Sequence, residues 1–232
     1  MESSTLGNAI DAFVFDAYGT LFDVHSVSEL ADELVPGQGF ALSNLWRAKQ
    51  LEYSWLLSVM AIPRESRSDF DAVTAQALDF ALASLAIELR AAERHRLRNA
   101  YLTLRPFPEV VSALDALASR PRWILSNGTL AMLQPLIRNA GLEAHVDGVL
   151  SVDAADIFKP SPRVYQLAVD RLQLPAARIG FVSSNCWDAM GAKAFGFKTF
   201  WINRRGAQVD RHASPPDFTL STLAELPPLV TR

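Results

Sequence analysis

The sequence predicts an α/β protein with a parallel sheet and helices on both of its faces, because three observations agree. Short runs rich in β-branched and aromatic residues recur, and most are apolar throughout, as expected of strands buried on both faces. Helical patterns separate these runs, which is typical of a parallel sheet. Residues 23–104 break this alternation and carry helical patterns only. We therefore expect an α/β core domain, residues 1–22 and 105–232, with a helical cap domain, residues 23–104, inserted after the first strand.

The expected elements of the core follow in chain order. The strand runs are AFVF at 12–15, RWIL at 122–125, GVLSV at 148–152, RIGFVSS at 178–184 and KTFWIN at 198–203. The helical patterns are 107–119 with Pro108 near the first turn, 130–141 with Gly141 just past the end, and 161–174 with Ser161 as N-cap and Pro162 as first helical residue. Residues 215–232 indicate a last short strand or loop and then a helical turn.

The inserted segment contains two long helical patterns, residues 42–60 and 69–89, and no convincing strand. In an open parallel sheet, ligands bind beyond the carboxyl ends of the strands. An insertion that leaves the sheet at that edge is therefore expected to cover the site. The sequence thus predicts a Rossmann-like core with a helical cap above its ligand-binding edge.

The composition favours a protein that acts on small molecules. The 232 residues are half apolar, and their formal net charge of -3 gives no basic field for nucleic acid or an anionic membrane. The single cysteine, Cys186, excludes an internal disulfide and a multi-cysteine metal site and favours a reducing compartment. The start, MESSTLGNAID, lacks the charged and apolar regions of a signal peptide, and no apolar run approaches a membrane span. We expect a cytoplasmic protein.

Polar residues concentrate just after the predicted strands, where loops of a parallel sheet usually carry function. They form four clusters: Asp16, Tyr18 and Thr20; Ser126, Asn127 and Gly128; Lys159; and Ser183, Asn185 and Asp188. Each has an ordinary structural explanation, such as a turn, a helix cap or a solvated lysine. Their convergence on one edge of one sheet favours a shared functional site instead.

These residues offer covalent catalysis by a carboxylate. Asp16, at a rigid strand end, can attack an electrophilic carbon or phosphorus and form an ester or an acyl phosphate. Lys159 is expected to keep Asp16 ionised despite burial, while Thr20 and Ser183 hydrogen-bond the carboxylate and fix its direction. Asp188 can then deprotonate a water molecule that cleaves the intermediate.

The segment FVFDAYGTLFD, residues 13–23, resembles the first motif of the haloacid dehalogenase superfamily. In the phosphatases of that superfamily, a second aspartate stands two residues after the nucleophile and protonates the leaving alkoxide. Tyr18 occupies this position here, and a phenol with a pKa of about 10 is too weak an acid for that task. The segment SSNCWD also offers Asp188 alone, without the paired acids of a magnesium site. A leaving halide needs neither a proton nor a metal.

The chain resembles the L-2-haloacid dehalogenase family over nearly its whole length. The matching segments, in the same order and at similar spacing, are FDAYGTLFDVHSV, LWRAKQLEYSWL, ILSNG, LSVD, FKPSPRVYQLA, FVSSNCWDAMGAKAFGF and WINR. The resemblance implies conversion of (S)-2-haloalkanoic acids to (R)-2-hydroxy acids and halide, without metal or cofactor. Asp16 would displace the halide from C2 by SN2 attack, and water would hydrolyse the aspartyl ester. The resemblance also implies a homodimer.

The same resemblance assigns roles to individual residues. The residues expected to position and charge-balance the nucleophile are Thr20, Lys159, Ser183 and Asn185, with Asp188 supporting ester hydrolysis. Ser126 is expected to bind the substrate carboxylate, and Arg47 and Asn127 the departing halide. The remaining substrate-binding residues are Tyr18, Leu51, Phe70 and Trp187, the last two as apolar walls. Tyr165 matches a tyrosine that is important for activity, and its role stays open.

The helical pattern around Arg47 gives its role independent support. One side of the helix carries Leu42, Trp46, Tyr53, Leu57 and Met60, whereas Arg47, Leu51 and Trp55 follow each other at i+4 on another side. An arginine among apolar residues that face the core would be poorly solvated and would attract an anion. The alternative is an arginine at the cap rim with only its stem buried. The two aromatics Tyr18 and Trp187 have a similar alternative, which is to fill space.

One departure from the family concerns the residue after Arg47. Ala48 stands where relatives often carry a glutamine, which suggests an altered halogen preference, with activity on fluoroacetate included. Two other functions are kept as alternatives. A magnesium-dependent phosphatase of the same superfamily is disfavoured by Tyr18, and a non-catalytic ligand-binding module is disfavoured by the presence of Asp16, Lys159 and Asp188.

Overall fold

A six-stranded sheet forms the centre of the protein, in a computed structural model that describes residues 9–60 and 62–230. The strand order is β3-β2-β1-β4-β5-β6, and every neighbouring pair is parallel. The strands are β1 (Ala12–Phe15), β2 (Arg122–Ser126), β3 (Gly148–Ser151), β4 (Ile179–Ser183), β5 (Lys198–Ile202) and β6 (Phe218–Leu220). This is the doubly wound order of a Rossmann-like sheet, so the predicted fold class is confirmed. Residues 215–232, which the sequence indicates as starting with a short strand or a loop, contain strand β6.

The central strand β1 explains why the strand runs are apolar throughout. Phe13, Val14 and Phe15 are fully buried, because β1 pairs with β2 on one side and β4 on the other while helices cover both faces. The packing is close enough to require a glycine on the neighbouring strand, since a Cβ at Gly180 would lie 2.8 Å from the Phe13 ring. The nucleophile candidate therefore follows one of the most constrained segments of the chain.

The helices of the core lie within the segments that the sequence indicates, and α5 is shorter at both ends than the predicted 107–119. They are α5 (Val110–Ala116), α6 (Leu130–Asn139), α7 (Pro162–Leu172), α8 (Cys186–Phe195) and α9 (Leu226–Val230). Gly141 follows α6 with a φ of +69°, as a residue just past a helix end should. Helix α5 begins at Val110, so Pro108 lies before the helix rather than in its first turn. Ser161 occupies the N-cap position of α7, but its side chain makes no capping hydrogen bond.

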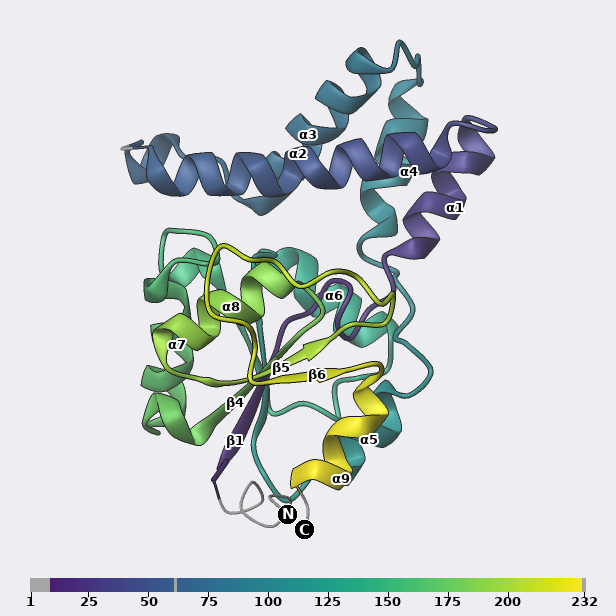
Figure 1. The fold of residues 1–232 in the computed structure, drawn as a ribbon. Coiled ribbons are helices and arrows are strands. Elements are labelled where there is room, and N and C mark those ends of the chain that lie inside the picture. The colour runs from purple at the N-terminus through teal and green to yellow at the C-terminus, as the bar shows by residue number, and fades with distance from the viewer. Residues whose placement is uncertain (1–8, 61, 231–232) are drawn as a thin grey trace.

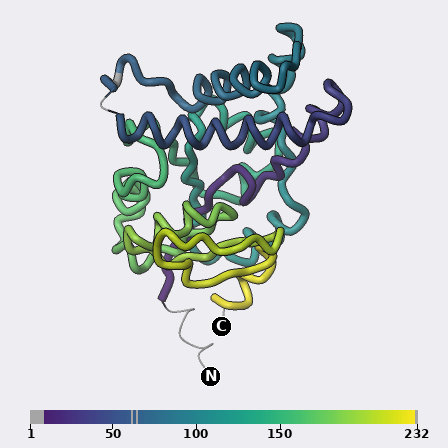
Figure 2. The backbone as a smooth tube through the Cα atoms, turned by 45° about the horizontal axis from the view of Figure 1, so that its top comes forward, coloured from purple at the N-terminus to yellow at the C-terminus, as the bar shows by residue number. Residues whose placement is uncertain are grey.

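Four helices form the cap: α1 (His25–Leu34), α2 (Gly39–Val59), α3 (Phe70–Ser84) and α4 (Ala91–Ala100). Figure 1 shows α2 lying across the molecule above the sheet, at the end to which β1 points, and Figure 2 shows the same arrangement from a tilted view. The two predicted cap helices are both present, and no strand occurs among the described residues of this segment. Met60, expected on the same side of the first helix as Leu42 and Trp46, lies just past its end and is half exposed.

The short 3-10 turns are η1 (Arg64–Ser66), η2 (Val152–Ala154), η3 (Ala176–Arg178) and η4 (Leu223–Glu225). The predicted domain boundaries after residue 22 and before residue 105 stay a prediction, and residues 1–8 and 231–232 of the predicted core lie outside the described residues. Within residues 9–60 and 62–230, no helix combines the length and the apolar character that crossing a membrane demands.

Candidate active site

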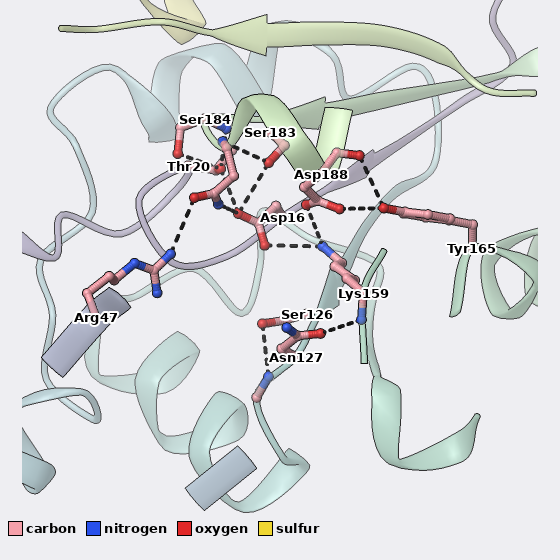
Figure 3. A network of polar contacts seen from close by, with 12 residues as sticks. Asp16, Thr20, Arg47, Ser126, Asn127, Lys159, Tyr165, Ser183, Ser184 and Asp188 are labelled. Carbon is pink, nitrogen blue, oxygen red and sulfur yellow. Dashed lines mark hydrogen bonds and ion pairs between the residues drawn. The ribbon is translucent and has the colours of Figure 1, made fainter. Parts of the chain in front are cut away.

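Asp16 directly follows β1, and its carboxylate is held by four side chains. Its Oδ2 atom accepts hydrogen bonds from Thr20 Oγ1 at 2.9 Å, Asn185 Nδ2 at 3.0 Å and Ser183 Oγ at 3.5 Å (Figure 3). Its Oδ1 atom accepts one, from Lys159 Nζ at 3.2 Å. Oδ2 is therefore saturated with donors, whereas Oδ1 keeps a lone pair for an incoming electrophile.

The loop that follows Asp16 is shaped by a glycine and an arginine. Gly19 has a φ of +84°, a conformation that favours glycine, and Thr20 comes next with its hydroxyl turned back to Asp16. Arg204 donates to the backbone oxygens of Gly19 at 3.2 Å and Thr20 at 3.1 Å. The Arg204 guanidinium also pairs with Glu109 at 2.7 Å. A residue that follows β5 thus fixes the position of the loop that follows β1.

Lys159 is the buried cation of the site. Its Nζ lies 3.2 Å from Asp16 Oδ1 and 2.9 Å from Asp188 Oδ2, and the residue is 1% exposed. Burial alone would lower the pKa of Lys159, but the charges and hydrogen bonds of the two aspartates more than offset this and raise its pKa above the ordinary value. Lys159 therefore stays protonated and compensates the charge of the carboxylates.

Asp188 lies in the first turn of α8 and is fully buried. Its Oδ2 accepts from Lys159, and its Oδ1 accepts from the Tyr165 hydroxyl at 2.8 Å. Burial raises the pKa of Asp188, helped by the nearby charge of Asp16, and Lys159 and Tyr165 offset only part of this increase. Burial also raises the pKa of Tyr165 well above its usual range, so Tyr165 acts as a neutral donor. A carboxylate with a raised pKa is a stronger base.

Arg47 reaches the site from the cap helix α2. Its Nη2 donates to Asn185 Oδ1 at 3.3 Å, and the same Asn185 donates to Asp16, so one amide connects the cap to the nucleophile. The Arg47 Nη1 donates to Gln50 Oε1 at 3.1 Å. Arg47 is half-buried and points toward Asp16 in Figure 3. The arginine therefore faces the core, as the helical pattern predicts, and is not a rim residue.

Ser126, the last residue of β2, and Asn127, which follows it, complete the polar part of the site. Ser126 is fully buried, and its Oγ accepts from the backbone N–H of Gly128 at 3.2 Å. Asn127 accepts from the backbone N–H of Lys159 at 2.9 Å through its Oδ1 atom. This bond fixes the Asn127 amide with its oxygen toward Lys159, so its NH2 group faces the opposite way. Ser126 and Asn127 thus lie in the network that surrounds Asp16, as predicted (Figure 3).

Aromatic side chains wall the site on the cap side. The ring of Tyr18 stacks on Phe70 with centroids 6.3 Å apart and meets Tyr101 edge-on at 5.7 Å. Burial raises the pKa of Tyr18, so its phenol stays protonated. The Tyr18 hydroxyl is buried and has no hydrogen-bond partner among the described residues, which leaves it as a donor for a bound group. A substrate-binding role for Tyr18 stays a prediction.

Two other residues predicted to bind substrate, Leu51 and Trp187, are half-buried. Leu51 lies on α2. Trp187 packs edge-on against Trp55 of the cap, with ring centroids 5.4 Å apart. The two tryptophans form a contact between cap and core. A substrate-binding role for Leu51 and Trp187 stays a prediction.

A cleft of about 600 Å³ opens beside Arg47 and Asn185, between the cap and the core. Its other walls include Tyr101, Phe107 and Arg204. Ala48 does not line this cleft and is exposed on α2. Gln50 supplies an amide beside Arg47, which weighs against an altered halogen preference caused by Ala48, and the effect of Ala48 stays a prediction.

Sequence reasoning missed four residues that shape the site: Gln50, Thr74, Ser184 and Arg204. Ser184 donates its backbone N–H to Thr20 Oγ1 at 2.8 Å. Gln50 stands at i+4 from the buried Trp46, so its place on the inner side of α2 was available from the helical period. Arg204 and Thr74 gave no local signal, because their partners are distant in sequence.

The site can perform nucleophilic displacement followed by hydrolysis. It combines a nucleophile with one free oxygen, a buried cation, a buried base and an arginine poised for an anion. In the part of the chain that the structure describes, no three His, Cys, Asp or Glu side chains gather as metal ligands would. The positive charge beside the two aspartates comes from Lys159.

Comparisons with known proteins agree with this chemistry. Residues 10–196 match the family model described as haloacid dehalogenase-like hydrolase. The chain is 43% identical to (S)-2-haloacid dehalogenase 2 of Pseudomonas sp. (strain CBS-3), over 95% of this chain and 96% of that protein. Its structure resembles that of an L-2-haloacid dehalogenase with a TM-score of 0.93 and 42% identity, covering 97% of this chain and 100% of that one. It also resembles the Xanthobacter autotrophicus enzyme with chloropropionic acid covalently bound, with a TM-score of 0.89 and 39% identity over 96% of this chain and 98% of that one.

Proposed function

This chain belongs to the haloacid dehalogenase-like hydrolases and, within them, to the L-2-haloacid dehalogenase family, and from that premise we propose how its residues work. The protein hydrolyses (S)-2-haloalkanoic acids to (R)-2-hydroxy acids and halide. The observation that carries this function is the Asp16 carboxylate, with Oδ2 bound by three donors and Oδ1 open beside Lys159. The covalently bound chloropropionic acid in the Xanthobacter relative supports a covalent route.

In the first step, Asp16 Oδ1 attacks C2 of the substrate from the side opposite the halogen. The new C2–O bond forms as the carbon–halogen bond breaks, the halide leaves with the bonding electrons, and C2 is inverted. We assign the charged Arg47 guanidinium and the Asn127 NH2 group as the hydrogen-bond donors that bind the departing halide. Ser126 binds the substrate carboxylate, and Tyr18, Leu51, Phe70 and Trp187 surround the rest of the molecule.

In the second step, water attacks the ester carbon of Asp16. Asp188 takes a proton from the water as its oxygen bonds to that carbon, the bond from the carbon to Oδ1 then breaks, and the departing alkoxide takes the proton back from Asp188. The Asp16 carboxyl loses its remaining proton to solvent, and the C2–O bond stays intact, so the inverted configuration is kept. Because Oδ1 carries the substrate carbon, Oδ2 is the carbonyl oxygen of the ester. Oδ2 becomes negatively charged when water adds to the ester carbon. Thr20, Ser183 and Asn185 already donate to this atom, and such prearranged donors stabilise an oxyanion.

The function is tested by halide release from L- and D-2-chloropropionate in separate reactions with excess EDTA. We expect chloride from the L isomer only, at a rate that EDTA does not change. A magnesium-supplemented p-nitrophenyl phosphate assay runs beside it. Phosphate release that requires magnesium, without chloride release, would show that the site serves phosphoesters and that the role of Tyr18 is misread.

We also propose that the protein is a cytoplasmic homodimer. Exposed apolar side chains on α2 and α3 support the dimer, and these are Trp55, Leu56, Val59 and Phe80. The single free cysteine supports a reducing location. Sedimentation at micromolar concentration tests the first proposal, because a monomer would contradict it, and cell fractionation tests the second.

A further inference from the structure

A chain of hydrogen bonds runs from Arg47 into the interior of the cap. Arg47 Nη1 donates to Gln50 Oε1 at 3.1 Å, and Gln50 Nε2 donates to Thr74 Oγ1 at 2.7 Å. The Thr74 hydroxyl in turn donates to the backbone oxygen of Phe70 at 2.6 Å. Gln50 is fully buried and Thr74 is 1% exposed. The chain therefore lies inside the cap, between α2 and α3, and ends at the guanidinium.

The direction of this chain is fixed by its two ends. The Phe70 carbonyl can only accept a hydrogen bond, so the Thr74 hydroxyl donates its single proton to that carbonyl. The Thr74 oxygen must therefore accept the hydrogen bond from Gln50. The NH2 group of Gln50 is thereby committed to Thr74, and its oxygen must face Arg47. An arginine has no acceptor atom, so the opposite orientation of the amide would leave two donors facing each other.

The same contacts hold the two helices in register. Trp46 Nε1, on α2, donates to the Thr74 backbone oxygen at 2.8 Å. Gln50 lies one turn beyond Trp46 and three residues beyond Arg47, so the amide and the guanidinium share a face of α2. Arg47 is thus held at Nη1 by Gln50, while its Nη2 spans the gap to Asn185.

We propose that Gln50 and Thr74 are positioning residues that hold the Arg47 guanidinium toward the reacting centre. Without them, this long side chain would be free to turn into the cleft of about 600 Å³ that it lines. A donor fixed before the reaction stabilises a departing anion better than one that must first be ordered. This inference rests on the proposed function, in which Arg47 donates hydrogen bonds to the departing halide.

A merely structural role is the competing explanation, and it makes a different prediction. Replacing both members of a buried hydrogen bond by apolar groups of similar shape is nearly neutral for stability, whereas removing one leaves an unpaired group. The double variant Gln50→Leu/Thr74→Val therefore keeps the cap folded while it removes the anchor of Arg47. Thr74→Ser keeps the hydroxyl and serves as the conservative rescue.

The test compares two inhibitors in the purified variants. Bromide reports on the halide site, and propionate, which lacks a halogen, reports on the carboxylate site. In the double variant we expect the inhibition constant of bromide to rise about 10-fold or more and kcat to fall about 10- to 100-fold. The inhibition constant of propionate should stay within about twofold, and Thr74→Ser should behave as the wild type.

A matched control tests the loss of a buried hydroxyl on the same helix. Ser54 is fully buried on α2 and donates to the backbone oxygen of Leu51 at 2.7 Å, without contact to Arg47. Ser54→Ala should leave both inhibition constants and kcat unchanged. Parallel loss of bromide and propionate binding in the double variant, or an unchanged kcat, would overturn the inference. A wild-type protein that releases no halide would instead overturn the proposed function, and the inference with it.

Discussion

Replacing Lys159 by methionine removes the buried cation while keeping a side chain of similar length. At 3.2 Å from Asp16 and 2.9 Å from Asp188, each attraction is about 5 to 6 kcal/mol at an effective dielectric constant of about 20. The cost of burying the charges offsets most of this, and breaking a buried pair costs about 3–5 kcal/mol in practice. For a chain of this size we expect the melting temperature to fall by roughly 10 °C. Halide release should fall about 100- to 1000-fold.

The pH dependence of this loss separates charge from packing. Burial already raises the pKa of Asp188 above its ordinary value of 3.8, and removing the Lys159 charge, which lowers that pKa, raises it further. A carboxyl whose pKa is raised on folding loses stability as pH rises from the unfolded to the folded pKa. The difference in melting temperature between Lys159→Met and the wild type should therefore become smaller at acid pH.

A surface variant provides the control for Lys159→Met. Lys193 is partly exposed and pairs with Asp217 at 3.2 Å, so Lys193→Met should cost less than about 1 kcal/mol and leave activity intact. Melting is followed by calorimetry between pH 5 and 8, and activity by halide release. An equal melting deficit at every pH, with activity reduced less than tenfold, would refute the reasoning.

Three further predictions follow from the same contacts. Asp16→Asn should abolish halide release, because the amide cannot form the ester, and measurable release from the purified variant would contradict the mechanism. Tyr165→Phe removes a hydrogen bond that lowers the pKa of Asp188, so the acid limb of kcat should move to higher pH. A profile measured between pH 4 and 8 checks this, and a limb that stays or moves down would count against Asp188 as the base. Ala48→Gln should leave the ranking of halogens unchanged, because residue 48 is exposed and Gln50 already supplies the amide at Arg47, and a changed ranking in a halogen series would restore the original expectation.

The sequence was sufficient to predict which residues of the core converge. Asp16 and Asp188 lie just beyond apolar strands and Lys159 lies in the loop after β3, and parallel strands end at one edge of the sheet, so the meeting of these three residues follows from topology. Arg47 was predicted to face the core because its neighbours at i+4 are apolar. These inferences depend on local patterns and on one rule of sheet architecture.

The details that were not predicted depend on contacts between distant segments. The partner of Gln50 is set by the rotation of α3 against α2, which no local pattern encodes. Arg204 contacts the Gly19–Thr20 backbone from more than 180 residues away. The assignment of donors between the two oxygens of Asp16 likewise depends on side-chain directions in β4 and α8. The helical or strand period determines on which face of an element a residue lies, whereas tertiary packing determines which residues it contacts there.

The division of the site between cap and core has a kinetic consequence. In the mechanism that we propose, Arg47, on α2, acts when the carbon–halogen bond breaks, whereas Asp188, on α8, acts when the ester is cleaved. Substitutions in the cap should therefore slow formation of the ester, so that no intermediate accumulates and no burst of halide precedes steady turnover. Substitutions around Asp188 should slow only its removal, giving a burst of one halide per active site and a protein whose mass is increased by the carboxyalkyl group bound to Asp16. The two half-reactions can thus be tuned from different segments of the same chain.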